Sequence, residues 1–169
     1  MGFVLDDIDL SGLGMAGILH DIEQVEVFKG PQSSVYGPNT MAGLIMLRST
    51  VPQDNFESDL TATYGSDNHY RLGLVSNVKI IRGLSLRVSG LKNYSDGFRE
   101  NISKNTTNSN KRDELLLRTK LKYQPNEKLV LVGTVMIANL DNGYDAWSPD
   151  NNQDFTTYSN DQGQDSQQQ

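Results

Sequence analysis

The sequence predicts a mainly β protein, in which an antiparallel up-and-down meander of about five strands follows a mixed, Gly-rich N-terminal segment. Two observations predict this fold. Between about residues 55 and 140, apolar and polar side chains alternate with a period of two over stretches of about ten residues, which is typical of strands. No run approaches the roughly 18 consecutive apolar residues of a membrane helix, so a helical membrane protein is excluded.

The alternating region divides into strands at its polar and Gly-containing segments. We predict strands over residues 57–65, 70–79, 84–89, 115–123 and 128–140. Short turns are predicted at Ser66–Asn68, Ile81–Gly83 and Gln124–Glu127, and a long polar loop at Ser95–Arg112. The last strand is less regular, because Val130, Val132 and Met136 occupy the face that should be polar.

Alternation alone leaves two interpretations of the meander open. A soluble antiparallel sheet packs its apolar face on a core and turns its polar face to water. A transmembrane β-barrel turns its apolar face to lipid and its polar face to the lumen. The barrel is favoured by strands near the roughly 9–11 residues that span a bilayer and by short turns that alternate with long loops. Tyrosines at the strand ends also favour it, because membrane interfaces lie there. They are Tyr64, Tyr70, Tyr94 and Tyr123.

Composition and charge argue against several classes of site. The chain has no Cys and two His, which excludes a thiolate metal site and leaves little for imidazole catalysis. Residues 141–169 hold six Asp and no Lys, Arg or Glu, so the net charge of −6 belongs to this tail. No basic footprint for nucleic acid is present. Residues Met1–Leu10 carry no signal-peptide pattern.

Two further motifs are weak. Gly12–Gly17 matches G-x-G-x-x-G, but three Asp residues precede it and would repel a pyrophosphate, so a flexible loop is favoured. Asp150, Asn152 and Asp154 have the spacing of a calcium loop, but Phe155 stands where Gly is required. Weak calcium binding by an acidic loop is the most that this segment predicts.

Residues 21–50 have a distinct pattern and read DIEQVEVFKGPQSSVYGPNTMAGLIMLRST. They predict a strand that ends at Lys29, a turn at Gly30-Pro31, one helical turn capped by Ser33 or Ser34, and a second strand at Leu44–Leu47. Taken alone, this arrangement fits an ordinary small α+β domain.

This segment closely resembles the plug-domain signature of TonB-dependent outer-membrane receptors, which runs roughly I-E-R-V-E-V-L-R/K-G-P-x-x-x-L-Y-G-x-x-x-x-G-G-x-I-N-I. The matching positions are Ile22, Glu23, Val25, Glu26, Val27, Lys29, Gly30, Pro31, Tyr36, Gly37, Gly43 and Ile45. Upstream, residues 4–10 resemble the family's V-x-x-D-G-x-P-L segment, with Asp7 in place of Gly and Asp9 in place of Pro. Ala42 and Met46 also depart from the pattern.

The resemblance implies a domain organisation. Residues 1–52 would be the C-terminal part of an α+β plug domain, residues 53–140 the first five strands of a transmembrane β-barrel, and residues 141–169 the start of an extracellular loop, truncated. The family's barrels have about twenty-two strands, and five strands cannot close. We therefore expect an incomplete barrel: a fragment that does not transport by itself.

The resemblance also implies a function. The family takes up scarce ligands with energy from the TonB complex, which acts through a TonB box missing from this chain. A ferric siderophore is the first expectation, with haem, cobalamin or a glycan as alternatives. The implied location is the cell outer membrane of a Gram-negative bacterium, and the implied partners are outer-membrane lipid and an iron chelate. No enzyme activity and no cofactor are expected. A secreted β-sheet binding or adhesin-like module is the alternative.

Two sets of functional residues are expected. Candidates for ligand contact in the last loop are Tyr144, Trp147 and Tyr158, with local loop packing as the alternative. The basic residues on the lumen face should lie partly against Glu23 and Glu26 of the plug. These basic residues are Arg71, Arg87, Arg118, Lys120 and Lys122.

Overall fold

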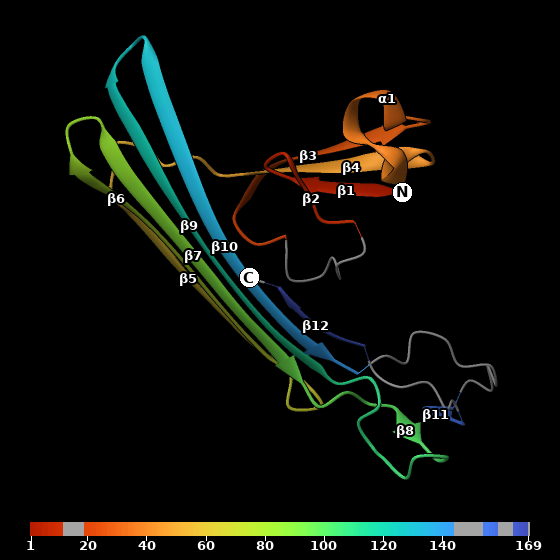
Figure 1. Ribbon diagram of the computed structural model, residues 1–169. Coiled ribbons are helices and arrows are strands. Elements are labelled where there is room, and N and C mark those ends of the chain that lie inside the picture. The colour runs from red at the N-terminus through yellow and green to blue at the C-terminus, as the bar shows by residue number, and fades with distance from the viewer. Residues whose placement is uncertain (12–18, 144–153, 159–163, 169) are drawn as a thin grey trace.

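The computed structural model describes residues 1–11, 19–143, 154–158 and 164–168, which form two separate β-sheets and a small two-stranded ladder (Figure 1). The N-terminal sheet has the strand order β2-β1-β4-β3, and the long sheet has the order β12-β10-β9-β7-β6-β5. The predicted mainly β, antiparallel fold is thus confirmed, and among the described residues the long sheet does not close into a barrel.

The N-terminal sheet is mixed, because β1 runs parallel to β4 while its other pairs are antiparallel. Its strands are β1 (Gly2–Leu5), β2 (Ile8–Asp9), β3 (Ile22–Lys29) and β4 (Gly43–Ser49). The turn between β1 and β2 consists of Asp6 and Asp7, with φ of 48° and 68°. Two residues with positive φ form the hairpin turn that suits the strand twist, and Asp tolerates this conformation better than most residues.

Helix α1 (Ser33–Tyr36) and the 3-10 helix η1 (Pro38–Thr40) connect β3 to β4. The predicted cap is wrong: the residue before the helix is Gln32, and it makes no side-chain capping hydrogen bond. Gly37 follows the helix with a φ of 90°, a conformation that favours glycine and ends the helical turn.

The long sheet is an antiparallel meander in which β6, β7, β9 and β10 are longer than predicted and β5 ends one residue earlier. Its strands are β5 (Glu57–Tyr64), β6 (Tyr70–Ile81), β7 (Leu84–Ser95), β9 (Arg112–Asn126), β10 (Leu129–Asn142) and β12 (Gln164–Gln168). Strand β12 pairs with the end of β10, where only a loop was expected. No helix among the described residues is long and apolar enough to cross a membrane.

The burial pattern of the long sheet is the opposite of that of a soluble sheet: its polar face is buried and its apolar face is exposed. Its polar face is buried, as shown by Asn77, Ser85, Arg87, Ser89, Asn93, Glu114, Arg118 and Lys120. Its apolar face is exposed, as shown by Leu60, Leu72, Leu74, Leu117, Leu121, Leu131, Val135 and Ile137. A soluble sheet would bury the apolar face. The pattern agrees with the barrel interpretation, in which this face meets lipid.

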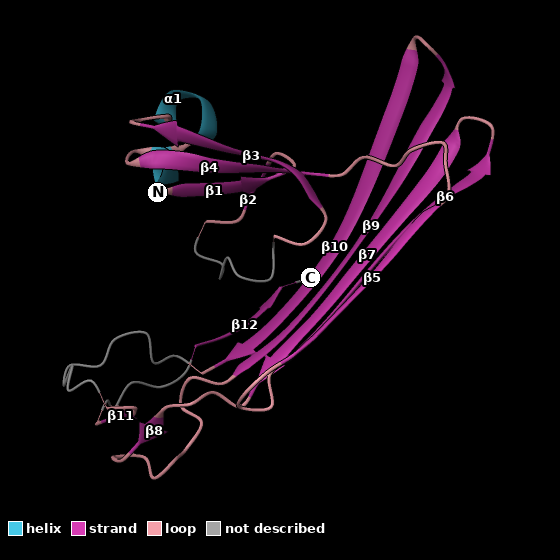
Figure 2. Ribbon diagram, turned by 180° about the vertical axis from the view of Figure 1, so that it is seen from behind, coloured by secondary structure: helices cyan, strands magenta, loops and turns pink. Residues whose placement is uncertain are grey.

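The N-terminal sheet lies on the polar side of the long sheet, and the ends of its strands point at it (Figures 1 and 2). Met136 of β10 packs against the core of the N-terminal sheet, which contains Phe3, Leu5 and Leu47. The apolar residue that interrupts the polar face of β10 is therefore a contact between the two sheets.

Two long connections meet at one end of the long sheet. β8 (Glu100–Asn101) pairs in parallel with β11 (Thr156–Thr157), so the β7–β9 connection is joined to the β10–β12 connection. We call this ladder and its flanking residues 98–103 and 154–158 the loop clasp.

Candidate functional site

The contact between the two sheets centres on Asp21, which lies just before β3. Its carboxylate receives hydrogen bonds from Arg87 of β7, with Nη2–Oδ1 at 2.7 Å and Nε–Oδ2 at 3.0 Å. Both side chains are almost fully buried, at 7% exposure for Arg87 and 5% for Asp21. Such bidentate, charge-assisted hydrogen bonds are the strongest that side chains form.

Arg118 of β9 binds the backbone of the same segment. Its Nη2 donates to the carbonyl oxygens of His20, at 2.6 Å, and Asp21, at 2.7 Å. Its Nη1 has no hydrogen-bond partner among the described residues, although the side chain is 2% exposed. A buried donor without an acceptor costs free energy.

His20 completes this contact against β6. Its Nε2 lies 3.3 Å from the carbonyl oxygen of Leu74, and its ring lies over Gly73. A Cβ at Gly73 would lie 3.0 Å from the ring carbon Cε1, so glycine provides the room for the ring. We call His20, Asp21, Gly73, Arg87 and Arg118 the Asp21 socket.

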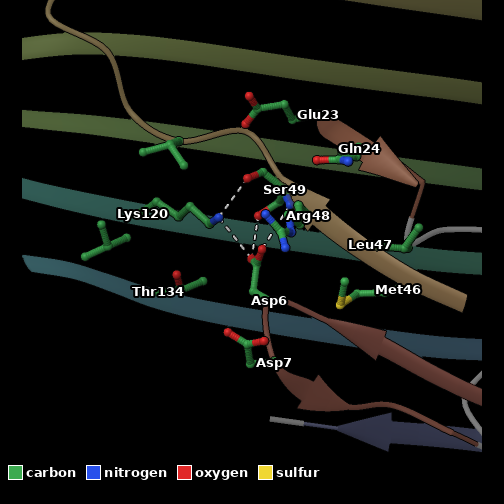
Figure 3. Close-up of a pocket in the computed structure, with 12 residues that line it drawn as sticks. Asp6, Asp7, Glu23, Gln24, Met46, Leu47, Arg48, Ser49, Lys120 and Thr134 are labelled. Atoms are coloured by element: carbon green, nitrogen blue, oxygen red, sulfur yellow. Dashed lines mark hydrogen bonds and ion pairs between the residues drawn. The ribbon is translucent and has the colours of Figure 1, made fainter. Parts of the chain in front are cut away.

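A second contact joins the β1–β2 turn to β9 through Asp6 (Figure 3). The Asp6 carboxylate accepts hydrogen bonds from the backbone N of Ser49, at 2.9 Å, and its hydroxyl, at 2.5 Å. Lys120 Nζ lies 3.0 Å from Asp6 Oδ2 and donates to the Ser49 carbonyl oxygen at 2.9 Å. The buried lysine thus joins β1, β4 and β9.

Both aspartates are held in their ionised form. Burial raises the pKa of the Asp6 carboxyl, but the hydrogen bonds from Ser49 and the Lys120 charge outweigh it, and the pKa lies below its usual range. Burial raises the pKa of Asp21 as well, but the hydrogen bonds from Arg87 and Thr50 and the charges of Arg87 and Arg118 together lower it by more. Each ion pair is therefore favoured at neutral pH.

A cavity of about 570 Å³ lies beside the Asp6 contact, between the N-terminal sheet and strands β9 and β10. Its charged lining residues are Asp6, Asp7, Glu23, Arg48 and Lys120. Figure 3 shows the Lys120 amine directed at Asp6 and Ser49, whereas Glu23 lies to one side.

The expected pairing between the two sheets is therefore half right. Arg87, Arg118 and Lys120 face the N-terminal sheet as predicted, but their acidic partners are Asp6 and Asp21. Glu23 is exposed and Glu26 accepts a hydrogen bond from Gln24. Asp6 and Asp21 lie next to strand ends that meet the long sheet, whereas Glu23 lines the cavity beside Lys120 and Glu26 lies further along β3.

The sequence reasoning missed Asp6 and Asp21 as site residues. Each has a positive φ, at 48° and 55°, which is uncommon outside glycine. The sequence offers one indication of this role, a carboxylate directly beside a turn, and that pattern is too common to identify a site.

The plug-signature residues form a compact hairpin around α1. Ile22, Glu23, Val25, Glu26, Val27 and Lys29 belong to β3, Gly30 and Pro31 to the turn, Tyr36 and Gly37 to the end of α1, and Gly43 and Ile45 to β4. The Tyr36 ring lies 6.5 Å from the Phe28 ring and packs against buried Val4, Leu44 and Met46.

The ligand candidates of the last loop are only partly described. Tyr144 and Trp147 lie outside the described residues, as do Gly12–Gly17 and most of the calcium-like triplet. Tyr158 is exposed in the loop clasp. Phe98 and Phe155 of the clasp are also exposed and pack edge to face, with ring centroids 5.4 Å apart. Within the part of the chain that the structure describes, no group of acidic or histidine side chains could hold a metal ion.

Comparison with curated proteins finds several receptors. The vitamin B12 transporter BtuB of Vibrio vulnificus is 29% identical over 80 residues, which are 47% of this chain and 13% of BtuB. The ferrioxamine receptor of Yersinia enterocolitica is 27% identical over 112 residues, 66% of this chain and 14% of the receptor. The metal-pseudopaline receptor CntO of Pseudomonas aeruginosa is 34% identical over 87 residues, 46% of this chain and 12% of CntO. The chain thus spans about an eighth of these relatives. No family model matches the chain.

Solved structures show the same fold. The ferric yersiniabactin uptake receptor FyuA of Yersinia pestis superposes with a TM-score of 0.73 at 19% identity, over 82% of this chain and 22% of FyuA. The ferric-catecholate import receptor Fiu of E. coli K12 has a TM-score of 0.69 at 20% identity, over 87% of this chain and 21% of Fiu. The ferripyoverdine receptor of the P. aeruginosa outer membrane covers 82% of this chain and 19% of its own, with a TM-score of 0.67 at 18% identity.

Proposed function

The chain shares its sequence pattern and its fold with TonB-dependent outer-membrane receptors of Gram-negative bacteria, and on this premise we propose that it is a fragment of a receptor for energy-coupled uptake of a scarce ligand, first of all a ferric siderophore. The fragment is not an enzyme and does not transport by itself. The long sheet, with its apolar face exposed and a globule docked on its buried polar face, is the observation that carries this proposal.

The proposal assigns a role to each part of the chain. Residues 1–52 are the C-terminal part of the plug, residues 53–140 are the first barrel strands, and residues 141–169 begin a further extracellular loop that ends in another strand, β12. The end of the sheet with the loop clasp faces outward, and the turns at residues 82–83 and 127–128 face the periplasm.

The ligand is proposed to bind at the outer end, where the clasp presents Phe98, Phe155 and Tyr158. Exposed rings held in a fixed mutual geometry suit a flat, partly apolar chelate. The TonB complex then draws on the plug, and the contacts at Asp6 and Asp21 are those that must open.

The test uses the complete receptor and radioactive iron carried by hydroxamate and catecholate chelates, with haem and cyanocobalamin as further probes. We expect energy-dependent uptake of one probe. Replacing both Phe98 and Phe155 with Ser should weaken its binding about tenfold, since two ring contacts contribute about 1.4 kcal/mol together. Phe56→Ser, at an exposed ring outside the clasp, is the matched control. Uptake of no probe, or equal binding by the clasp variant and the control, would contradict the proposal.

A further inference from the structure

In the segment between the two sheets, residues 50–56, a buried asparagine of the barrel wall binds the backbone. Asn77 of β6 is 0% exposed. Its Oδ1 accepts a hydrogen bond from the backbone N of Gln53 at 3.0 Å, and its Nδ2 donates to the Gln53 carbonyl oxygen at 2.9 Å. The same Nδ2 also donates to the carbonyl oxygen of Asn55. The Asn77 amide thus makes three hydrogen bonds to the backbone of residues 50–56, two as a donor and one as an acceptor.

Further contacts hold the same segment. The Asp54 carboxylate lies 2.8 Å from Lys79 Nζ of β6 and accepts a hydrogen bond of 2.8 Å from Ser85 Oγ of β7. Pro52 is fully buried. We call the contacts that Asn77, Lys79 and Ser85 make with residues 52–55 the linker clamp.

The linker clamp differs from the two plug contacts in its backbone conformation. Asp6 and Asp21 have positive φ, and Arg118 beside Asp21 keeps a buried donor without a partner among the described residues. None of residues 50–56 has a positive φ. Strained or incompletely bonded contacts are those that conformational changes use. The clamp has neither feature.

We propose that the linker clamp is a permanent anchor. When the plug detaches at Asp6 and Asp21, its C-terminal end stays bound to the barrel through the clamp, and the plug pivots about residues 50–56. This inference rests on the proposed function, because it takes the N-terminal sheet to be a plug that moves. It makes Asn77 a positioning residue for that movement.

The test pulls the N-terminal end of the plug with a force probe, in the complete receptor reconstituted in lipid. In the unmodified receptor, the extended chain should end before residue 50. In Asn77→Leu, the released chain should be about 24 Å longer, because the seven residues 50–56 then extend at about 3.4 Å each. Asn77→Asp keeps the shape of the side chain but loses both donors, and it should show the longer release at lower force.

Asn93→Leu is the matched control. Asn93 is a buried asparagine on the same face of the sheet, but it contacts Glu114 and His69 and not the linker. Its released length should equal that of the unmodified receptor. Heat-modifiable gel mobility shows which variants have folded. If Asn77→Leu does not fold, Asn77→Asp decides.

Two results would overturn the anchor: an equal released length in the unmodified receptor and the folded Asn77 variants, or release of residues 50–56 in the unmodified receptor. The experiment uses neither ligand nor TonB. A receptor that takes up no probe but shows the predicted lengths would contradict the proposed function and leave the anchor standing.

Discussion

At the scale of single residues, two aspartates connect the N-terminal sheet to the long sheet, and both have a left-handed backbone conformation. Asp6 and Asp21 have φ of 48° and 55°. Such conformations are uncommon outside glycine, although Asp adopts them more readily than most residues. Asp6 is held by Ser49 and Lys120, and Asp21 by Arg87 and Arg118.

Asp21→Asn should weaken the docking of the plug. Among the described residues, the substitution leaves buried Arg87 with Glu57 alone as an acidic partner, at 3.3 Å. Breaking a buried ion pair costs about 3–5 kcal/mol. We expect hydrogen exchange of the β3 and β4 amides to accelerate accordingly. Asp59→Asn, at an exposed carboxylate on β5, should leave exchange unchanged. Equal hydrogen exchange in the two variants would contradict a role of the Asp21 socket in docking.

Docking should also depend on pH at the acidic end of the scale. The folded-state pKa values of Asp6 and Asp21 lie below the ordinary value of 3.8. Their contribution to stability is therefore complete above about pH 4, and it is lost as the pH falls through the lowered values. Limited proteolysis of the plug between pH 7 and pH 2.5 measures this loss. The Asp6→Asn, Asp21→Asn double variant should lack the transition, and a midpoint above pH 5 would contradict the assignment.

At the scale of elements, the signature hairpin of β3, α1 and β4 depends on its glycines. Gly43 begins β4 with a φ of 128°, and an added Cβ would lie 2.8 Å from the carbonyl oxygen of Phe28. Both the backbone conformation and the close approach of β3 require glycine.

Gly43→Ala should therefore disrupt the start of the β3–β4 pairing. We expect a loss of about 2 kcal/mol, from the unfavourable φ and the displaced Phe28 carbonyl. Thermal unfolding of the plug, followed by hydrogen exchange, measures it. Gly133→Ala is the control, because a Cβ there meets no atom within 4 Å. The same small effect at both positions would show that the hairpin tolerates a side chain.

At the scale of the whole molecule, the long sheet contacts the N-terminal sheet through charged side chains and presents apolar ones on its opposite face. The wall uses Arg87, Arg118 and Lys120, which lie on two neighbouring strands. The outward face needs an apolar solvent, because its exposed leucines and valines would be unfavourable in water.

Spin labels should report this arrangement directly. Labels at Leu117 and Leu121 in the complete receptor should be accessible to oxygen dissolved in lipid and protected from a water-soluble relaxation agent. A label at Ser89, buried on the opposite face, should be protected from both. Water accessibility at the two leucines would contradict the membrane interpretation.

The sequence predicted the elements better than their contacts. The period-two alternation located the strands β5, β6, β7, β9 and β10, because side chains on a strand alternate between faces whatever surrounds them. The signature located the β3–α1–β4 hairpin. The predicted acidic partners of the basic residues were wrong. They depend on the direction in which the N-terminal sheet meets the long sheet, which contacts between residues far apart in the sequence decide.

The sequence by itself determined which face of each strand is apolar and where the chain turns, since both follow from local spacing. Only the tertiary structure decided that the polar face is the buried one, that Asp6 and Asp21 are its acidic partners, and that Asn77 holds the linker. These contacts join residues up to 114 positions apart, such as Asp6 and Lys120, and no local pattern encodes which of the many polar side chains will meet.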